Sequence, residues 1–349
     1  MTTDIIYHRI FALHRMSAGH PECPERVKMA MAEIRRSDVL ADESARVIEA
    51  RPAPLSEIEA IHDRSYLSTI QQMSEQGGGF FTLDTSVNEF TYKAALLAAG
   101  GGILAVDRVL QGVSRNAFVL CRPPGHHAER SRAFGFCFIN NVAVAANHLL
   151  SRRGLDRVAI IDYDAHHGNW TQDTFYSSNR VLYVGLHQDG RTLFPGSGFV
   201  DETGVGKGVG YTVNIPMYPG AGKSSYRLAF EEVVLPVIDS FKPQFILASA
   251  GFDCHHSDPL TNLGLTLQDI ARMNAHLLDM ARDYSEDNLV LFLEGGYNLE
   301  VVALASRVLV EQLAGAHPNV PSETSRESKI CFDNVRATVD ELKRNLGLT

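Results

Sequence analysis

The sequence has few cysteines and no long apolar run. Its five cysteines are widely separated, odd in number and never spaced as Cys-x-x-Cys, which argues against a disulfide framework or a cysteine-based zinc finger. No segment reaches the ~18 apolar residues that a membrane-spanning helix requires. Asp4, His8 and Arg9 interrupt the first apolar stretch, which is unlike a secretion signal. These absences predict a cytoplasmic protein without a membrane segment.

The chain also lacks a run of Lys or Arg. Its formal net charge is −9, from 32 Lys and Arg against 41 Asp and Glu, so we expect no nucleic-acid partner. What is present is a globular composition: 349 residues, 45% of them hydrophobic and 21% charged. Such a chain can bury a large core without disulfides.

Short apolar runs alternate with longer amphipathic stretches. Most of the runs are apolar on both faces, as in strands buried between helices. This alternation predicts one α/β domain of three layers, a mostly parallel sheet with helices on both faces and a ligand site beyond the carboxyl ends of the strands. The predicted strands are 117–120, 158–161, 181–186, 211–215, 245–250 and 289–293, and the predicted helices are 92–110, 140–152, 224–240 and 266–283, the last with Thr266 as N-cap.

The C-terminal part is assigned to the same domain, which therefore spans residues 1–349. Residues 318–328 are polar, contain two prolines and predict a surface loop. A final helix should follow and pack on the domain through one apolar face made of Ile330, Val335, Val339, Leu342 and Leu346.

Reactive residues follow four of the predicted strands. PPGHH comes after the run ending at Leu120, DYDAHHGN after VAII, GFD after ILASA and EGGY after LVLFL. Because the carboxyl ends of parallel strands meet at one edge of a sheet, these four segments should converge on one crevice.

Asp162, Asp164 and His166 alternate along the chain just past a buried strand, so their side chains point to one side. Asp253, at the end of another strand, supplies a further anionic donor. One histidine and two carboxylates, Asp164, His166 and Asp253, suit a catalytic zinc ion with an open position, although other divalent metals are possible. The alternative for the first segment is a cluster that only caps a helix and a turn.

The motifs together resemble the signature loops of class II histone deacetylases and of their prokaryotic relatives, the deacetylase-like amidohydrolases and acetylpolyamine amidohydrolases. They are RPPGHHAERSRAFGFCFINN, DYDAHHGNWTQDTF, LFPGSG, SAGFDCHHSDPL and LEGGYNL, between about His20 and Leu299. The resemblance implies an arginase-deacetylase type fold. Arginase-like ureohydrolases share it but bind two manganese ions through extra carboxylates, and here Gly168 and His255 stand at those positions, which favours one metal.

The resemblance also implies roles for the catalytic residues. His127 is the general base and acid, while His126 orients the substrate and stabilises charge. Asp162 pairs with His126, and the neutral Asn169 pairs with His127, where class I members carry Asp. Tyr297 polarises the substrate carbonyl.

Further positions match the substrate tunnel of the family. Phe136 and Phe194 would be its walls, with Gly135 at the side, although ordinary core packing is the alternative for either ring. Asp84 would be the rim carboxylate that grips substrate backbone amides, and Leu260 stands where polyamine-specific relatives often have an acidic gatekeeper.

Two other family features concern an arginine and potassium. Arg26 resembles the residue that guards the internal channel for the acyl product, and a solvated charge at a helix start is the alternative. Potassium is a possible structural ion. The matching positions are Asp162, Asp164, His166, Gly185 and Leu186 for one site and Phe175, Val181 and Tyr211 for a second.

The sequence therefore predicts zinc-dependent hydrolysis of an N-acyl, most simply N-acetyl, amide on a lysine side chain of a protein or peptide. Deacetylation of acetylpolyamines, as small acylated amines, is the nearest alternative; Leu260 and the absence of a large insertion weigh against it. A non-catalytic module that binds acyl-lysine or a partner protein is the second alternative, and a binuclear ureohydrolase is the third. The acyl length and the oligomeric state stay open.

Overall fold

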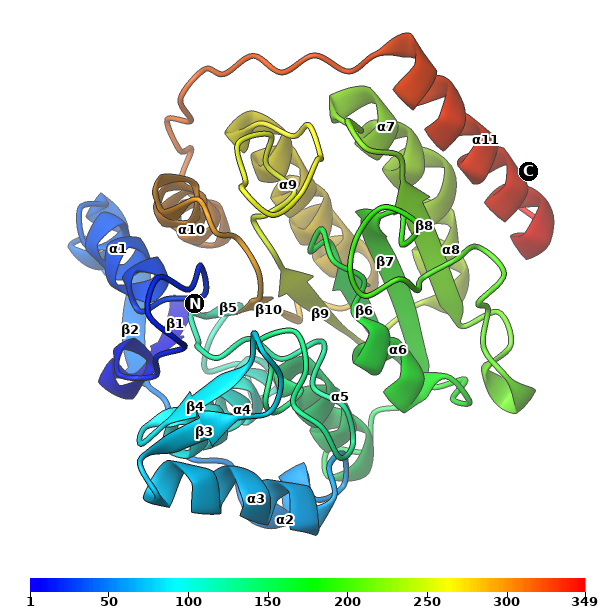
Figure 1. Ribbon diagram of the computed structural model, residues 1–349. Coiled ribbons are helices and arrows are strands. Elements are labelled where there is room, and N and C mark those ends of the chain that lie inside the picture. The colour runs from blue at the N-terminus through cyan, green and yellow to red at the C-terminus, as the bar shows by residue number, and fades with distance from the viewer. Residues whose placement is uncertain (349) are drawn as a thin grey trace.

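Across residues 1–348, which the computed structural model describes, the core of the fold is one eight-stranded sheet with every neighbouring pair parallel (Figure 1). The strand order is β2-β1-β5-β10-β9-β6-β7-β8. The strands are β1 (Thr3–Tyr7), β2 (Ala45–Glu49), β5 (Ala117–Val119), β6 (Val158–Asp162), β7 (Val181–Gln188), β8 (Thr212–Met217), β9 (Phe245–Ala250) and β10 (Leu289–Leu293).

Helices cover both faces of the sheet (Figure 1). On one face, α4 (Thr91–Leu110) contacts β1, β5 and β10, and α5 (Asn141–Ser151) contacts β6 and β9. On the other face, α9 (Leu267–Tyr284) contacts β10 and α10 (Leu299–Leu313) contacts β1, with α1 (Glu25–Ile34) packed on α10. The predicted three-layer α/β architecture is confirmed.

Smaller elements surround these layers. A two-stranded antiparallel hairpin of β3 and β4 lies beside α3. The remaining elements are α2 (Leu55–Ile58), α3 (Arg64–Glu75), β3 (Gly78–Phe80), β4 (Ser86–Asn88), α6 (Asn169–Phe175), α7 (Lys223–Ala229), α8 (Leu235–Phe241), α11 (Lys329–Leu346), the π-helical η4 (Phe230–Val234) and the 3₁₀ turns η1 (Arg9–Ala12), η2 (Asp38–Leu40) and η3 (Gly206–Gly208).

The six predicted strands are all present, and every residue of the observed strands is buried, although β8 begins at Thr212, one residue later than predicted. The predicted helices are present too, and Thr266 caps α9 together with Asp269. The predicted helix 224–240 is helical throughout but contains the π-helical turn η4 just before Pro236. Proline lacks the backbone N–H that a regular α-helix needs there, which accounts for the wider turn.

The sequence pattern did not predict β1, β2, α1 or α10. The second residue of β1, Asp4, is a buried charge that precedes its apolar residues. Arg46 and Arg108 donate to this carboxylate at 2.8 and 2.5 Å from distant parts of the chain. The other strands were predicted from uninterrupted apolar runs. β1 was missed because its buried ion pair places a charged residue in the strand.

The final helix, α11, packs on α7, η4 and β8. Its buried residues are Cys331, Val335, Val339 and Leu342, and Leu346 is half-buried. The prediction for Ile330 was wrong, because its side chain is 69% exposed. The buried positions recur every three or four residues, and Ile330 lies off that stripe.

No helix among residues 1–348 combines the length and the apolar character needed to cross a membrane.

We expect Leu342→Ala to lower the free energy of unfolding by about 2–5 kcal/mol, because it removes a fully packed side chain from the interface of α11. Ile330→Ala is the matched control and should change it by less than about 0.5 kcal/mol, since that side chain is exposed. Urea unfolding followed by circular dichroism measures both. Equal losses for the two variants would contradict this packing of α11.

Candidate active site

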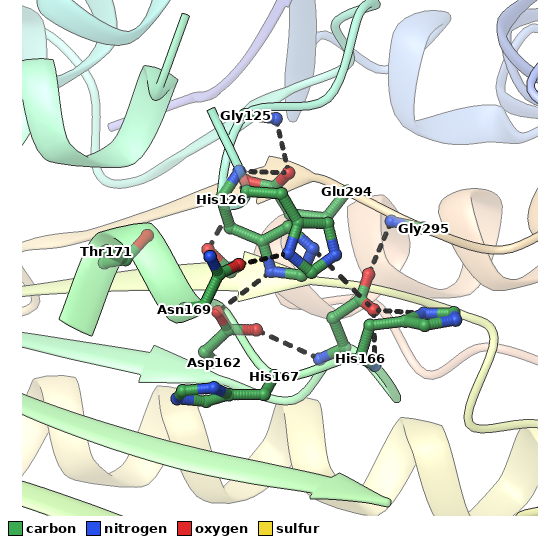
Figure 2. A network of polar contacts seen from close by, with 12 residues as sticks. Gly125, His126, Asp162, His166, His167, Asn169, Thr171, Glu294 and Gly295 are labelled. Atoms are coloured by element: carbon green, nitrogen blue, oxygen red, sulfur yellow. Dashed lines mark hydrogen bonds and ion pairs between the residues drawn. The ribbon is translucent and has the colours of Figure 1, made fainter. Parts of the chain in front are cut away.

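The site lies beyond the carboxyl ends of the four central strands. β5, β10, β9 and β6 are consecutive neighbours in the sheet, so the segments that follow them are brought together at one edge. Figure 2 shows His126, Asp162 and Glu294, from three of these segments, gathered in one place, and Asp253 from the fourth lies 2.9 Å from His166. The predicted convergence of four strand ends is therefore confirmed.

Three potential metal ligands meet at this edge. The ring nitrogen Nδ1 of His166 lies 2.9 Å from Asp253 Oδ2 and 3.2 Å from Asp164 Oδ1. All three residues are buried, and their donor atoms lie within 4.8 Å of one another. Donors bound to one zinc ion at 2.0–2.2 Å in a tetrahedron are about 3.3 Å apart, so the spacing and the donor types fit such an ion.

Backbone amides orient the two carboxylates. The N–H groups of His166 and Gly295 donate to the two oxygens of Asp164 at 2.8 and 2.6 Å. The N–H of Ala165 donates to Asp253 Oδ1 at 2.8 Å. Burial and the charge of Asp164 raise the pKa of Asp253 above its usual value. A divalent cation would relieve the repulsion between these two carboxylates.

The surroundings leave no room for a carboxylate side chain at position 168, where the binuclear ureohydrolases have an extra metal ligand. A Cβ atom on Gly168 would lie 2.1 Å from Asp162 Oδ2, so a bulkier residue cannot fit while Asp162 keeps its position. His255, the other position compared with the ureohydrolases, is buried and directs Nε2 to Glu323 Oε2 at 2.9 Å. This geometry favours one metal rather than a bridged pair.

His255, His256 and Glu323 form a second group of potential metal ligands within residues 1–348. The N–H of Ser257 donates to Nδ1 of His255 at 3.2 Å, which leaves the proton on Nε2 to donate to Glu323. The same glutamate accepts the N–H of Leu267 at 2.7 Å. Hydrogen bonds thus account for His255 and Glu323, and they hold the segment before α11 against the core.

The two adjacent histidines have the predicted partners. Nδ1 of His126 lies 3.1 Å from Asp162 Oδ2, and Nδ1 of His127 lies 2.7 Å from Asn169 Oδ1 (Figure 2). The two ring centroids are 4.0 Å apart. Because the amide oxygen of Asn169 only accepts, Nδ1 of His127 carries the proton and its Nε2 has a free lone pair.

The environment separates the pKa values of these histidines. Burial lowers the pKa of His126, but the charges of Asp162, Asp164 and Glu294 outweigh it and raise the pKa to about 10. Burial, and then the positive charges of His126 and His166, hold the pKa of His127 well below its usual value. The pair is therefore arranged as one imidazolium and one neutral imidazole.

Glu294 belongs to the EGGY motif, but its part in the site was not predicted from the sequence. This fully buried residue accepts the backbone N–H groups of Gly125 and His126 at 2.7 and 3.2 Å (Figure 2). The signal in the sequence was a glutamate that directly follows a wholly apolar strand, where a charged side chain needs specific partners.

Aromatic rings surround the donor cluster. The ring centroid of Phe194 lies 5.2 Å from that of His127, and its side chain is 38% exposed. The ring centroid of Tyr297 lies 6.4 Å from that of His166 and 5.8 Å from that of Phe136. Residues 136, 194 and 297 thus border the cluster.

Gly135 lies between His127 and Phe194. A Cβ atom at this glycine would lie 2.5 Å from the imidazole Cδ2 and 3.0 Å from the phenyl Cε1, and its φ of +54° disfavours other residues. Ordinary core packing does not describe Phe194, because its ring is partly open to solvent beside the histidine.

Asp84 is exposed, in the loop between β3 and β4. The hydroxyls of Thr82 and Thr85 donate to its carboxylate at 2.5 and 3.1 Å, and Thr85 also accepts the N–H of Phe136 at 3.2 Å. Through Thr85, Asp84 is therefore connected to Phe136.

Leu260 is half-buried and is connected to the tyrosine. Its N–H donates to Asp258 Oδ1 at 2.9 Å, and Asp258 Oδ2 accepts the N–H of Tyr297 at 2.7 Å.

Arg26 is fully buried, so the solvated alternative was wrong. Its Nε donates to the carbonyl of Gly296 at 2.6 Å, Nη2 donates to the carbonyl of Glu294, and Nη1 lies 3.1 Å from Glu22 Oε1. Its guanidinium also lies 5.2 Å from the ring centroid of Tyr297.

The residues named for potassium fall into two groups. Asp162 at the end of β6 pairs in register with Gly185 of β7, and Leu186, Asp164 and His166 follow these two positions closely in the chain. Phe175 ends α6, Val181 begins β7, and Tyr211 accepts the N–H of Tyr183 just before β8. Both potassium sites stay predictions.

Comparison with known proteins agrees with this geometry. Residues 20–313 match the histone deacetylase domain. The chain is 41% identical over 300 residues to a probable deacetylase of Archaeoglobus fulgidus, covering 86% of this chain and 82% of that protein. It is 35% identical over 338 residues to a histone deacetylase-like amidohydrolase of Pseudomonas aeruginosa, covering 95% and 88% of the two.

A solved structure gives the same result for the fold. The crystal structure of the HDA15 HD domain superposes with a TM-score of 0.89 at 33% identity, covering 98% of this chain and 94% of that one. With the matched domain and relatives above, the chain belongs to the histone deacetylase family and is a hydrolase of the deacetylase type.

Proposed function

We propose that the protein hydrolyses the N-acyl amide of an acylated lysine side chain, with one zinc ion held by Asp164, His166 and Asp253. The observation that carries this proposal is the buried His127, whose Nδ1 is bonded to Asn169 and whose ring lies 6.1 Å from that of His166, beside the three donors. A divalent ion bound there would supply Lewis acidity to the substrate carbonyl and acidify a water molecule.

In this proposal His127 transfers the protons. Its Nδ1 proton is held by Asn169 at 2.7 Å, so Nε2 accepts a proton from the attacking water and then donates it to the leaving amine. His126, kept positive by the carboxylate of Asp162 3.1 Å away, stabilises the negative charge that develops on the substrate.

Tyr297 completes the polar environment of the reacting carbonyl. Burial holds the pKa of its hydroxyl well above the usual value, so the hydroxyl keeps its proton and acts as a hydrogen-bond donor. We propose that it donates to the oxyanion, on the side of the carbonyl away from His126 and His127.

The aromatic border supports a long, unbranched substrate arm. Phe194 lies beside His127 and Phe136 beside Tyr297, and two flat rings that line the path of an alkyl chain favour an arm without branches. An acyl-lysine in a peptide and an N-acyl diamine both meet this requirement. The apolar Leu260 favours the lysine, because it offers no charge for the distal ammonium of a diamine.

We also propose that α11 belongs to the catalytic domain. The packing of Val335, Val339 and Leu342 against the core supports this, as does the hydrogen bond from His255 to Glu323 ahead of the helix.

Amine release from an acetyl-lysine peptide and from an N-acetylated diamine, measured side by side, tests the substrate. We expect the zinc-loaded protein to prefer the peptide and to lose activity with a chelator. Leu260→Glu should move the preference toward the diamine, because a carboxylate attracts its free ammonium. A wild-type preference for the diamine would contradict the lysine assignment.

The Asn169→Asp variant should need a higher pH for activity. The basic form of His127 is present only above its pKa, and a carboxylate next to Nδ1 stabilises the protonated form and raises that pKa by about one unit or more. The acid limb of the kcat/KM profile should therefore move to higher pH. Asn169→Ala is the matched control and should move it the other way, because it removes a hydrogen bond that raises this pKa. An acid limb that moves to lower pH in Asn169→Asp and to higher pH in Asn169→Ala would exclude His127 as the base.

The Tyr297→Phe variant should lower kcat by about 10²–10³-fold, as loss of one oxyanion donor does, while KM changes little. Steady-state kinetics on the acetyl-lysine peptide measure both constants, and metal content shows whether the site is intact. A variant that keeps its turnover within about threefold of wild type would remove Tyr297 from the reaction.

A further inference from the structure

Glu294 is a buried carboxylate to which the proposed chemistry gives no proton-transfer step. It directly follows β10 and is fully buried. Figure 2 shows its carboxylate beside the loop that carries His126. Within residues 1–348 no Lys or Arg side chain bonds this carboxylate; its Oε2 accepts from two backbone N–H groups, of Gly125 at 2.7 Å and His126 at 3.2 Å.

The backbone of Glu294 is held in place by the sheet and by α1. Its N–H donates to the carbonyl of Ala250 at 3.1 Å, which continues the pairing of β10 with β9. Its carbonyl accepts Nη2 of Arg26, which is itself fully buried. The carboxylate therefore extends from a backbone that cannot shift without disturbing a central strand.

The loop on the other side is short and depends on contacts of this kind. The N–H of Ala128 donates to the carbonyl of Gly125 at 2.9 Å and closes a tight turn around the two histidines. The carbonyl of His126 accepts the N–H of Thr171 at 3.3 Å. Glu294 supplies the contact from the β10 side and satisfies two buried amide donors with one oxygen atom.

The segment that begins at Glu294 also reaches the other parts of the site. The N–H of Gly295 donates to Asp164 Oδ2 at 2.6 Å, and Tyr297 follows two residues later. Glu294 therefore connects the histidine loop to the segment that contacts Asp164 and carries Tyr297. Its side chain influences how far His126 and His127 lie from these two residues.

We propose that Glu294 is a positioning residue: its carboxylate oxygen accepts the N–H groups of Gly125 and His126 and so sets the position of His126 and His127 relative to Tyr297. The inference rests on the proposed deacetylation. The site requires a hydrogen-bond acceptor oxygen at the end of a side chain as long as that of glutamate. The negative charge of the Glu294 carboxylate is secondary. The oxygen that does not bind the loop, Oε1, lies 3.4 Å from the hydroxyl of Ser249, which can accept from an amide NH₂ group.

Two conservative variants separate reach from charge. Glu294→Gln keeps the reach and loses the charge, so kcat on the acetyl-lysine peptide should stay within about threefold of wild type. Glu294→Asp keeps the charge but is one methylene shorter, so it should lower kcat by about 10-fold to 10²-fold, since an error of about 1 Å in a reacting group has costs of this size. KM should stay within about threefold in both, and zinc content and thermal unfolding show that each variant is folded.

Glu311, a buried glutamate on α10 outside the site, is the matched position. Glu311→Gln and Glu311→Asp should both keep wild-type kcat. A Glu294→Asp enzyme as fast as wild type, or a Glu294→Gln enzyme as slow as Glu294→Asp, would overturn the inference. If Glu294→Asp does not fold, Glu294→Gln still tests the proposal. A folded Glu294→Gln enzyme whose kcat falls more than about threefold below wild type refutes the acceptor role. Absence of turnover in the wild type would instead count against the proposed function.

Discussion

Buried negative charge at the carboxyl ends of the central strands is the constraint on which the rest of the site depends. An ionised carboxylate without partners in a protein interior is strongly unfavourable. These carboxylates have partners of three kinds: the imidazole of His126 for Asp162, backbone amides for Asp164 and Asp253 and, in our proposal, a zinc ion shared by the last two. Asp162, Asp164 and Asp253 are each at most 1% exposed.

The same charges give two adjacent histidines different properties. His126 lies against the carboxylate of Asp162, while His127 lies against the neutral amide of Asn169. Carboxylates raise the pKa of the first, and burial with neighbouring positive charge lowers that of the second. In the proposed hydrolysis, the charged imidazole stabilises negative charge and the neutral one, 4.0 Å away, acts as the base.

The convergence of four loops at one edge of the sheet could be predicted because each loop follows a strand that is buried on both faces and therefore easy to recognise, as with Asp164 after β6. The order of the strands could not, since the insertion of β10 between β5 and β9 depends on pairing between distant segments. β1 was missed because buried Asp4 breaks its apolar pattern and its partners lie elsewhere. Glu294 was missed for a related reason: its partner Gly125 is a backbone amide 169 residues away.

The central claim is that one divalent metal, held by Asp164, His166 and Asp253, drives the reaction. Titration of the metal-free protein with zinc, with bound metal and deacetylation of an acetyl-lysine peptide followed together, tests it most directly. The account predicts that activity rises with bound zinc and saturates at about one ion per chain, and that His166→Ala prevents both binding and activity. Activity that needs a second ion, or that persists without metal, would contradict it.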